Sequence, residues 1–212
     1  MSSRSLTAAR RRPARARAVA RRRRLGAIMA VAALTAVVVV VGARLGPDAV
    51  RELTLPLKHE DVIRQQAADK SLDPALIAAV IYQESKFRDR TSSAGAKGLM
   101  QILPDTAKFI AHKSGGTAFE LRDLGTPQIN IAYGSWYLRY LLKRYDGNTK
   151  LAVAAYNAGE TNVDGWVSKA GGPGKFDAVR DIPFPETRAY VSVVLEKQRE
   201  YRHNYAHELG IH

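Results

Sequence analysis

The sequence predicts an all-α protein with one globular domain. From about His59 onward the apolar residues recur every three or four positions, the spacing of one helix face, and no run alternates strictly between apolar and polar residues as a strand does. Hydrophobic residues make up 46% and charged residues 25% of the 212 residues, a balance typical of a globular protein. Paired capping and proline residues mark several helix starts, so we expect a helical domain over 59–212.

The N-terminal segment predicts a single transmembrane helix. Residues 1–24 contain ten arginines and no acidic residue, and the next 19 residues, 25–43, carry no charge. As a helix, the uncharged run would rise about 28 Å, close to the roughly 30 Å hydrocarbon core of a membrane. Because arginine-rich tails stay in the cytoplasm, we expect 1–24 inside and the body outside the cell membrane. The alternative is a secreted protein released near Ala43, since Val41-Gly42-Ala43 resembles a signal cleavage site.

The body itself is nearly neutral and lacks cysteine. The net charge of +13 belongs to the tail: without its ten arginines and Arg44, 22 basic residues face 20 acidic ones. A nucleic-acid-binding domain needs a basic face, so no nucleic-acid partner is expected. The absence of cysteine excludes thiol nucleophiles and zinc–thiolate sites. His203 and His207 are four residues apart but have no third ligand, so we expect neither metal nor cofactor.

The linker and the helices follow in order along the chain. Gly46, Pro47 and Pro56 indicate a linker over 44–58. Asp73-Pro74 predicts the first clear helix, over 74–88, with aspartate as N-cap and proline in the first turn. Further helices are expected over 127–145 after Thr126-Pro127, over 150–158 after an N-cap at Asn148 or Thr149 and before Gly159, and over about 186–207. The tyrosines and tryptophan over 133–141 are predicted to be core.

A carboxylate occupies the apolar face of the first clear helix. Glu84 follows Val80 by four residues and Ile81 by three, where most helices carry leucine. Burial disfavours the charged form, so the pKa of Glu84 is expected to rise from about 4.3 toward about 7. A carboxyl that keeps its proton at neutral pH is what general-acid cleavage of a glycosidic bond requires. The spacing alone also fits a hydrogen-bonded structural glutamate, or one at the surface edge of the apolar face.

Four short motifs occur in a fixed order along the body. They are Glu84-Ser85, Gly98-Leu99-Met100-Gln101, Ala155-Tyr156-Asn157-Ala158-Gly159 and Glu186-Thr187-Arg188-Ala189-Tyr190-Val191. With these separations, the chain resembles the soluble lytic transglycosylase (SLT) family, whose lysozyme-like catalytic domain cleaves peptidoglycan. The resemblance spans about 70–195 and implies a lysozyme-like helical fold.

The resemblance also implies roles for individual residues. Glu84 matches the catalytic acid/base of the family, and Leu103 departs from the methionine that many relatives carry. The positions that match substrate-binding residues are Ser92, Met100, Gln101, Tyr156, Asn157 and Tyr190. Purely structural roles stay open for several of them: core packing for the two tyrosines, a bridge within loop backbone for the glutamine and a helix-end role for the asparagine.

The family chemistry needs one carboxyl group. Glu84 would protonate the oxygen between N-acetylmuramic acid and N-acetylglucosamine, and its carboxylate would then deprotonate the muramic C6 hydroxyl, which closes a 1,6-anhydro ring on C1. An intramolecular hydroxyl has a large effective concentration compared with water. The expected partners are peptidoglycan glycan strands, the membrane through 25–43 and other cell-wall enzymes. The alternatives are a lysozyme-type hydrolase and a non-catalytic, membrane-tethered peptidoglycan-binding module.

Overall fold

The computed structural model describes residues 23, 26–33, 35, 46, 49, 51–116 and 118–212. The chain divides into two compact units, Met1–Thr54 and Leu55–His212. Most of the expected cytoplasmic tail and of the expected transmembrane span 25–43 lies outside the described residues, although 26–33 are helical. Among the residues described, no helix combines the length and the apolar character needed to cross a membrane.

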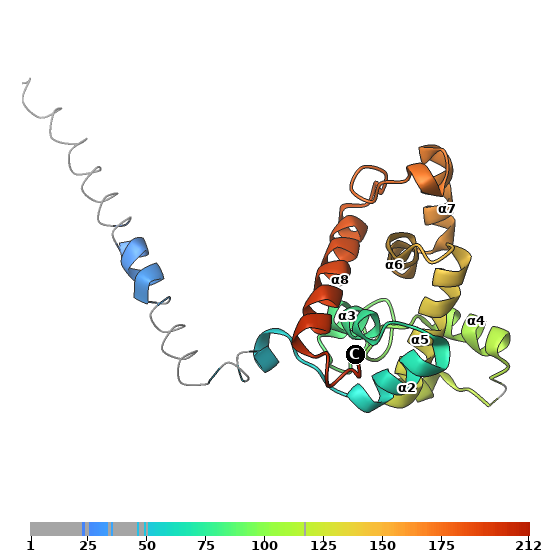
Figure 1. Ribbon diagram of the computed structural model, residues 1–212, viewed down its shortest axis with the longest axis horizontal. Coiled ribbons are helices and arrows are strands. Elements are labelled where there is room, and N and C mark those ends of the chain that lie inside the picture. Colours follow the sequence, from blue (N-terminus) through green and yellow to red (C-terminus); the bar gives the residue numbers. More distant parts are fainter. Residues whose placement is uncertain are drawn as a thin grey trace, which may run out of the picture. The chain divides into compact units, whose positions relative to one another are not determined.

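The second unit is built from helices, which confirms the predicted class (Figure 1). The α-helices are α2 (Glu60–Lys70), α3 (Pro74–Ser85), α4 (Pro104–Ser114), α5 (Pro127–Arg144), α6 (Thr149–Ala158), α7 (Glu160–Ala170) and α8 (Pro185–Asn204). Two short 3₁₀ helices, η1 (Leu121–Gly125) and η2 (Pro173–Lys175), lie in the connections. Isolated antiparallel bridges join Thr91 to Lys97 and Lys97 to Ile102 in the loop between α3 and α4.

The helix ends follow from local chemistry. The Asp73 side chain accepts a hydrogen bond from the Ala75 amide at 3.0 Å, which caps α3 as predicted. The cap of α6 is Asn148, whose side chain accepts from the Leu151 amide at 3.2 Å. Helix α3 ends at Ser85, three residues before the predicted end, because the next two residues adopt φ values of 54° and 58°.

Helix α3 lies in the centre of the unit. Every residue from Ala75 to Ile81 is at most 3% exposed, as expected for a helix that is apolar on all sides. Its main neighbour is α8, which also packs on α6, and α6 in turn packs on α5 and α7 (Figure 1). The end of α3 that carries Glu84 is therefore enclosed by elements from the second half of the chain.

Two sequence predictions are corrected by this packing. The segment 44–58 is not wholly a linker: residues 51–54 are helical, and Leu55 is only 4% exposed. The hydroxyl of Tyr205 donates to the Leu55 carbonyl at 2.8 Å, and that of Tyr201 donates to the Pro56 carbonyl.

The aromatic residues over 133–141 are half-buried rather than core, because the buried face of α5 is made by its smaller residues and its aliphatic ones.

The half-buried rings of α5 stack on one another at its surface. The Trp136 and Tyr140 rings are nearly parallel, with centroids 5.7 Å apart, and Phe109 of α4 meets Tyr140 edge-on at 5.3 Å. Such pairs add to the stability that area burial gives, by about 0.5–1.5 kcal/mol each. The stack therefore fixes α4 on α5 from outside the core.

Candidate active site

Glu84 lies in the last turn of α3 and is half-buried. The hydroxyl of Tyr190, on α8, donates to Glu84 Oε1 at 2.6 Å, and the Arg90 guanidinium donates to the Glu84 backbone carbonyl. Burial raises the pKa of Glu84 to about 7, although the Tyr190 hydrogen bond and the charge of Arg90 both lower it. Desolvation therefore outweighs the two contacts that stabilise the charged form, and the carboxyl is about half protonated near neutral pH.

A second tyrosine approaches the acid from α6. The hydroxyl of Tyr156 donates to the Met100 carbonyl at 3.0 Å. Burial raises the pKa of Tyr156 well above its usual value, and the charge of Glu84 raises it further. Beside Tyr156, the exposed Asn157 accepts a hydrogen bond at Oδ1 from the Thr187 hydroxyl, at 2.8 Å.

Gln101 lies in the loop before α4 and has a φ of 47°. Its side-chain nitrogen donates to the Arg90 carbonyl at 2.9 Å and to the Gly98 carbonyl at 2.7 Å. The glutamine thus bridges loop backbone, which was one of the two roles left open by the sequence. With both amide hydrogens engaged, its Oε1 is the atom that can accept a hydrogen bond from a ligand.

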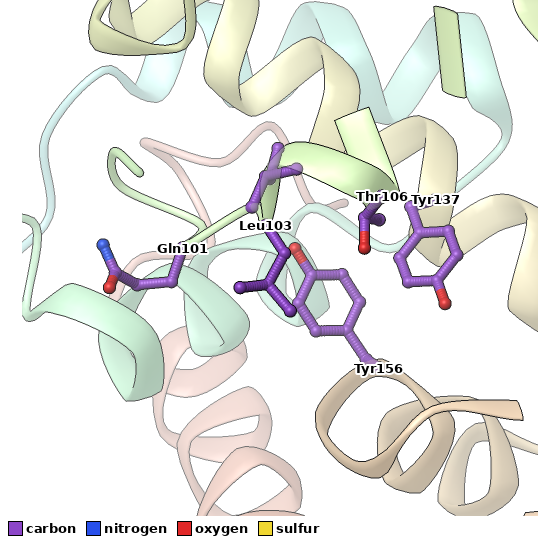
Figure 2. A pocket seen from close by; sticks show the side chains of 6 residues that line it. Gln101, Leu103, Thr106, Tyr137 and Tyr156 are labelled. Atoms are coloured by element: carbon purple, nitrogen blue, oxygen red, sulfur yellow. The ribbon is translucent and has the colours of Figure 1, made fainter. Parts of the chain in front are cut away.

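A small pocket adjoins this loop (Figure 2). Its lining residues are Gln101, Ile102, Leu103, Thr106, Tyr137 and Tyr156. Figure 2 shows the Tyr156 ring rising from α6 between Leu103 and Tyr137. Leu103 is 46% exposed, so the residue that departs from the family pattern lies where it can alter the shape of the site.

The remaining predicted residues, Ser92 and Met100, also lie in the loop between α3 and α4. The Ser92 hydroxyl accepts a hydrogen bond from the Ala96 amide at 3.1 Å. Met100 is fully buried, and its sulfur would lie 2.3 Å from a Cβ added at Gly134 of α5. A side chain without exposed surface cannot contact a sugar directly, so Met100 shapes the site from beneath.

Asn130, on α5, is the residue that sequence reasoning missed. It is fully buried, its Oδ1 accepts from the Met100 amide at 2.8 Å, and its Nδ2 donates to the carbonyls of Lys97 and Leu124 at 2.9 Å each. One side chain thus satisfies three backbone groups and holds the loop against α5. The available signal was its position four residues before Gly134, on the apolar face of the helix.

The site therefore combines a carboxyl that is partly protonated at neutral pH, a tyrosine hydroxyl that donates to it, and a nearby pocket lined by polar and aromatic groups.

Within the described ranges 51–116 and 118–212, no three histidine or acidic side chains cluster closely enough to hold a metal ion. The model of the family described as "Transglycosylase SLT domain" matches residues 61–179. The chain belongs to this family.

Several SLT-domain proteins are similar to the chain. The soluble lytic murein transglycosylase of Salmonella typhimurium is 34% identical over 163 residues, which cover 72% of this chain and 24% of that protein. The membrane-bound lytic murein transglycosylase F of Pseudomonas fluorescens is 32% identical over 114 residues, covering 50% of this chain and 22% of that protein. The crystal structure of the 70 kDa soluble lytic transglycosylase from Escherichia coli superposes with a TM-score of 0.69 at 32% identity, covering 76% of this chain and 26% of that one.

These SLT-domain relatives are much longer than the matched region. The chain spans about a quarter of the length of the curated relatives it matches. The family model ends at residue 179, before α8, although α8 supplies the tyrosine that donates to Glu84. The site of this SLT domain is therefore completed by a helix outside the region that the family model covers.

Proposed function

We propose that this SLT domain is a peptidoglycan lytic transglycosylase with Glu84 as its single acid/base. The observation that supports the proposal is the carboxyl whose pKa is raised to about 7 and whose oxygen accepts the Tyr190 hydroxyl. A general acid works best when its pKa lies near the operating pH, because a large fraction of it is then protonated and it is still acidic enough to donate that proton. An ordinary surface glutamate would be deprotonated under the same conditions.

The proposed reaction cleaves the β-1,4 bond between N-acetylmuramic acid and N-acetylglucosamine. Glu84 gives its proton to the bridging oxygen as that oxygen leaves C1, and the 2-acetamido group helps to stabilise the positive charge that develops there. The Tyr190 hydroxyl then donates to the newly charged carboxylate and stabilises it. Glu84 next takes the proton of the C6 hydroxyl as the C6 oxygen bonds to C1, so an anhydro ring forms, the acid is restored and no water is consumed.

The remaining predicted residues are proposed to hold the sugar. Gln101 can accept a hydrogen bond through Oε1, since its amide hydrogens are engaged with loop carbonyls. Tyr156 supports the same loop through the Met100 carbonyl and lines the pocket with its ring. Ser92 is proposed to bind from the rim, and Met100 contributes by shape because it has no exposed surface.

Mass analysis of the products tests the reaction. Digestion of purified peptidoglycan should release muropeptides with 1,6-anhydromuramoyl ends, and Glu84→Gln should abolish release while the helical circular dichroism signal is kept. Reducing ends that carry one added water would show a lysozyme-type hydrolase. Binding without any product over long incubation would show a peptidoglycan-binding module instead.

We also propose that the domain is held at the outer face of the cell membrane by residues 25–43, with 1–24 in the cytoplasm. The support is the uncharged run after an arginine-rich tail. Fractionation of cells that express the chain with an N-terminal tag tests the topology. Tagged full-length chain in the membrane fraction supports the anchor, whereas untagged domain in the medium shows cleavage near Ala43.

A further inference from the structure

Helix α8 offers two hydroxyl groups to neighbouring helices. Thr187 precedes Tyr190 by three residues, so the two side chains share one face of α8 and are roughly 4.5 Å apart along its axis. Tyr190 donates to Glu84 of α3, and Thr187 donates to Asn157 of α6. The two contacts therefore start from positions about one turn apart on α8.

The Thr187 hydrogen bond decides which atoms of Asn157 face outward. Thr187 is 1% exposed and donates to Asn157 Oδ1, whereas Asn157 itself is exposed. An asparagine amide has one oxygen acceptor and one nitrogen with two donor hydrogens. With the oxygen turned toward the buried hydroxyl, the nitrogen is the polar atom presented at the exposed end of α6.

The Gln101 side chain shows the opposite polarity. Its nitrogen is engaged with the Arg90 and Gly98 carbonyls, so its oxygen is the atom left to a ligand. The two amides thus offer one donor and one acceptor, and each is fixed by a partner that is not itself a ligand contact. An acetamido group carries the matching pair, an N–H donor and a carbonyl acceptor.

We propose that Thr187 is a positioning residue, which holds the Asn157 amide as a hydrogen-bond donor to an acetamido carbonyl oxygen of the glycan. Without the hydroxyl, the amide turns its oxygen outward to solvent, because an oxygen held against an apolar side chain would lack a hydrogen-bond donor. Returning the nitrogen to the outward position for the ligand then costs about one hydrogen bond. An oxygen facing a carbonyl oxygen is repulsive, so the loss falls on binding of the sugar. This inference rests on the proposed function, because that function supplies the glycan.

Binding measurements on the full chain test the proposal, in a Glu84→Gln background where turnover does not interfere. The probe is peptidoglycan glycan strands from which the peptides have been removed. Thr187→Val, which keeps the size and removes the hydroxyl, should weaken binding by about five- to tenfold, the effect of one hydrogen bond. Thr187→Ser keeps the hydroxyl and should bind within about twofold of the parent.

A double-mutant cycle separates positioning from a structural role. In an Asn157→Ala background, Thr187→Val should cause no further loss, because the amide that it orients is gone. An equal loss in both backgrounds, or a Thr187→Ser variant as weak as Thr187→Val, would overturn the proposal.

Steady-state kinetics give a second, independent readout. In the chain with Glu84 intact, Thr187→Val should raise KM and leave the alkaline limb of the pH profile in place, since Tyr190 still donates to the acid. A shift of that limb would mean that α8 had moved, and would contradict the positioning role. If the parent chain releases no product while the binding cycle behaves as expected, the catalytic proposal fails and the positioning of Asn157 stands.

Discussion

Glu84 combines two requirements that oppose each other within one side chain. The apolar surroundings that keep its proton on at neutral pH also make its charged form unfavourable in the folded protein. A rise in pKa from 4.5 to about 7 corresponds to about 3 kcal/mol between the two protonation states. The residue is therefore expected to reduce stability under the conditions in which it works, as catalytic groups often do.

The first prediction concerns this cost in stability. Below the unfolded-state pKa of Glu84, the folded and unfolded states both hold the proton, and above about pH 7 neither does. Between these limits the unfolded state loses its proton first, so the free energy of unfolding of the wild type decreases as the pH rises, whereas a residue that does not titrate causes no such decrease. Glu84→Gln should therefore gain up to about 3 kcal/mol over the wild type between pH 4.5 and pH 8. Urea unfolding of both proteins across this range checks it, and a stability difference that does not change with pH would contradict the raised pKa.

The second prediction concerns the hydroxyl that touches the acid. Tyr190 lowers the pKa of Glu84, so Tyr190→Phe should raise that pKa above about 7. Because the protonated form starts the reaction, kcat/KM falls as pH rises through this pKa, and the alkaline limb should move to higher pH in the variant. Pre-steady-state or steady-state pH profiles measure it; an alkaline limb that moved to lower pH would mean that Tyr190 does not act on Glu84 as the geometry indicates.

At the scale of elements, the site depends on a loop whose backbone is bonded by Asn130 of α5 at Met100 and Lys97. Asn130 bonds three backbone groups, and Gly98 lies directly on it: a Cβ at Gly98 would be 2.1 Å from Asn130 Nδ2 and 2.6 Å from the Leu124 carbonyl oxygen. No rotation of the asparagine relieves the contact with backbone. The loop that carries Gln101 is therefore tightly coupled to the position of α5.

The third prediction compares two glycines of this loop. Gly98→Ala must displace Asn130 and should lower the free energy of unfolding by about 3 kcal/mol or more, with loss of activity. Gly95 has a similar φ of 80° but open space around it, so Gly95→Ala should cost only the backbone strain of about 1–2 kcal/mol. Denaturant unfolding and product release are measured on both; equal losses would show that φ alone sets the effect and that Asn130 is not the anchor.

Two of the helices that the sequence predicted begin with a side-chain cap. Asp73 and Asn148 bond the first turns of α3 and α6, and such caps involve residues two or three apart. Helices α4 and α7 were not predicted, and α2 was covered only by the general helical spacing from His59 onward; α4 was missed although Pro104 lies in its first turn. Helix α7 follows α6 after the single residue Gly159 and contains Gly165 and several polar residues of weak helix propensity, so no loop composition separates the two helices.

The site divides in the same way. The placement of Glu84 on an apolar face predicted its raised pKa, since that argument needs only the helix period. Its contact with Tyr190 joins residues 106 apart, and the contact between Met100 and Asn130 joins residues 30 apart. No local pattern encodes such pairs. The family resemblance indicated the tyrosine, whereas the asparagine lies outside all four motifs and became visible only in the packing.

At the scale of the whole domain, hydrogen bonds connect the beginning of the folded unit to its last helix and the segment after it. The hydroxyls of Tyr201 and Tyr205 on and after α8 donate to the backbone of Leu55 and Pro56, and Leu55 is buried. The same α8 carries Tyr190 and Thr187 toward the site. Residues 55 and 56 thus steady the helix that completes the site, although they precede the first helix of the domain.

The fourth prediction follows from this closure and concerns where the folded domain begins. A chain that starts at residue 59 loses the burial of Leu55, about 2 kcal/mol, and also loses the two backbone carbonyls that accept hydrogen bonds from Tyr201 and Tyr205. Its free energy of unfolding should be about 3–5 kcal/mol below that of a chain that starts at residue 55. Tyr201→Phe supplies the internal control: it should destabilise the chain from 55 by about 1 kcal/mol and leave the chain from 59 unchanged, because its bond to the Pro56 carbonyl exists only in the longer one. Equal stability of the two chains would place the boundary at 59, where the helical spacing of the sequence begins, and would mean that the contacts of Leu55 and Pro56 add nothing to the fold.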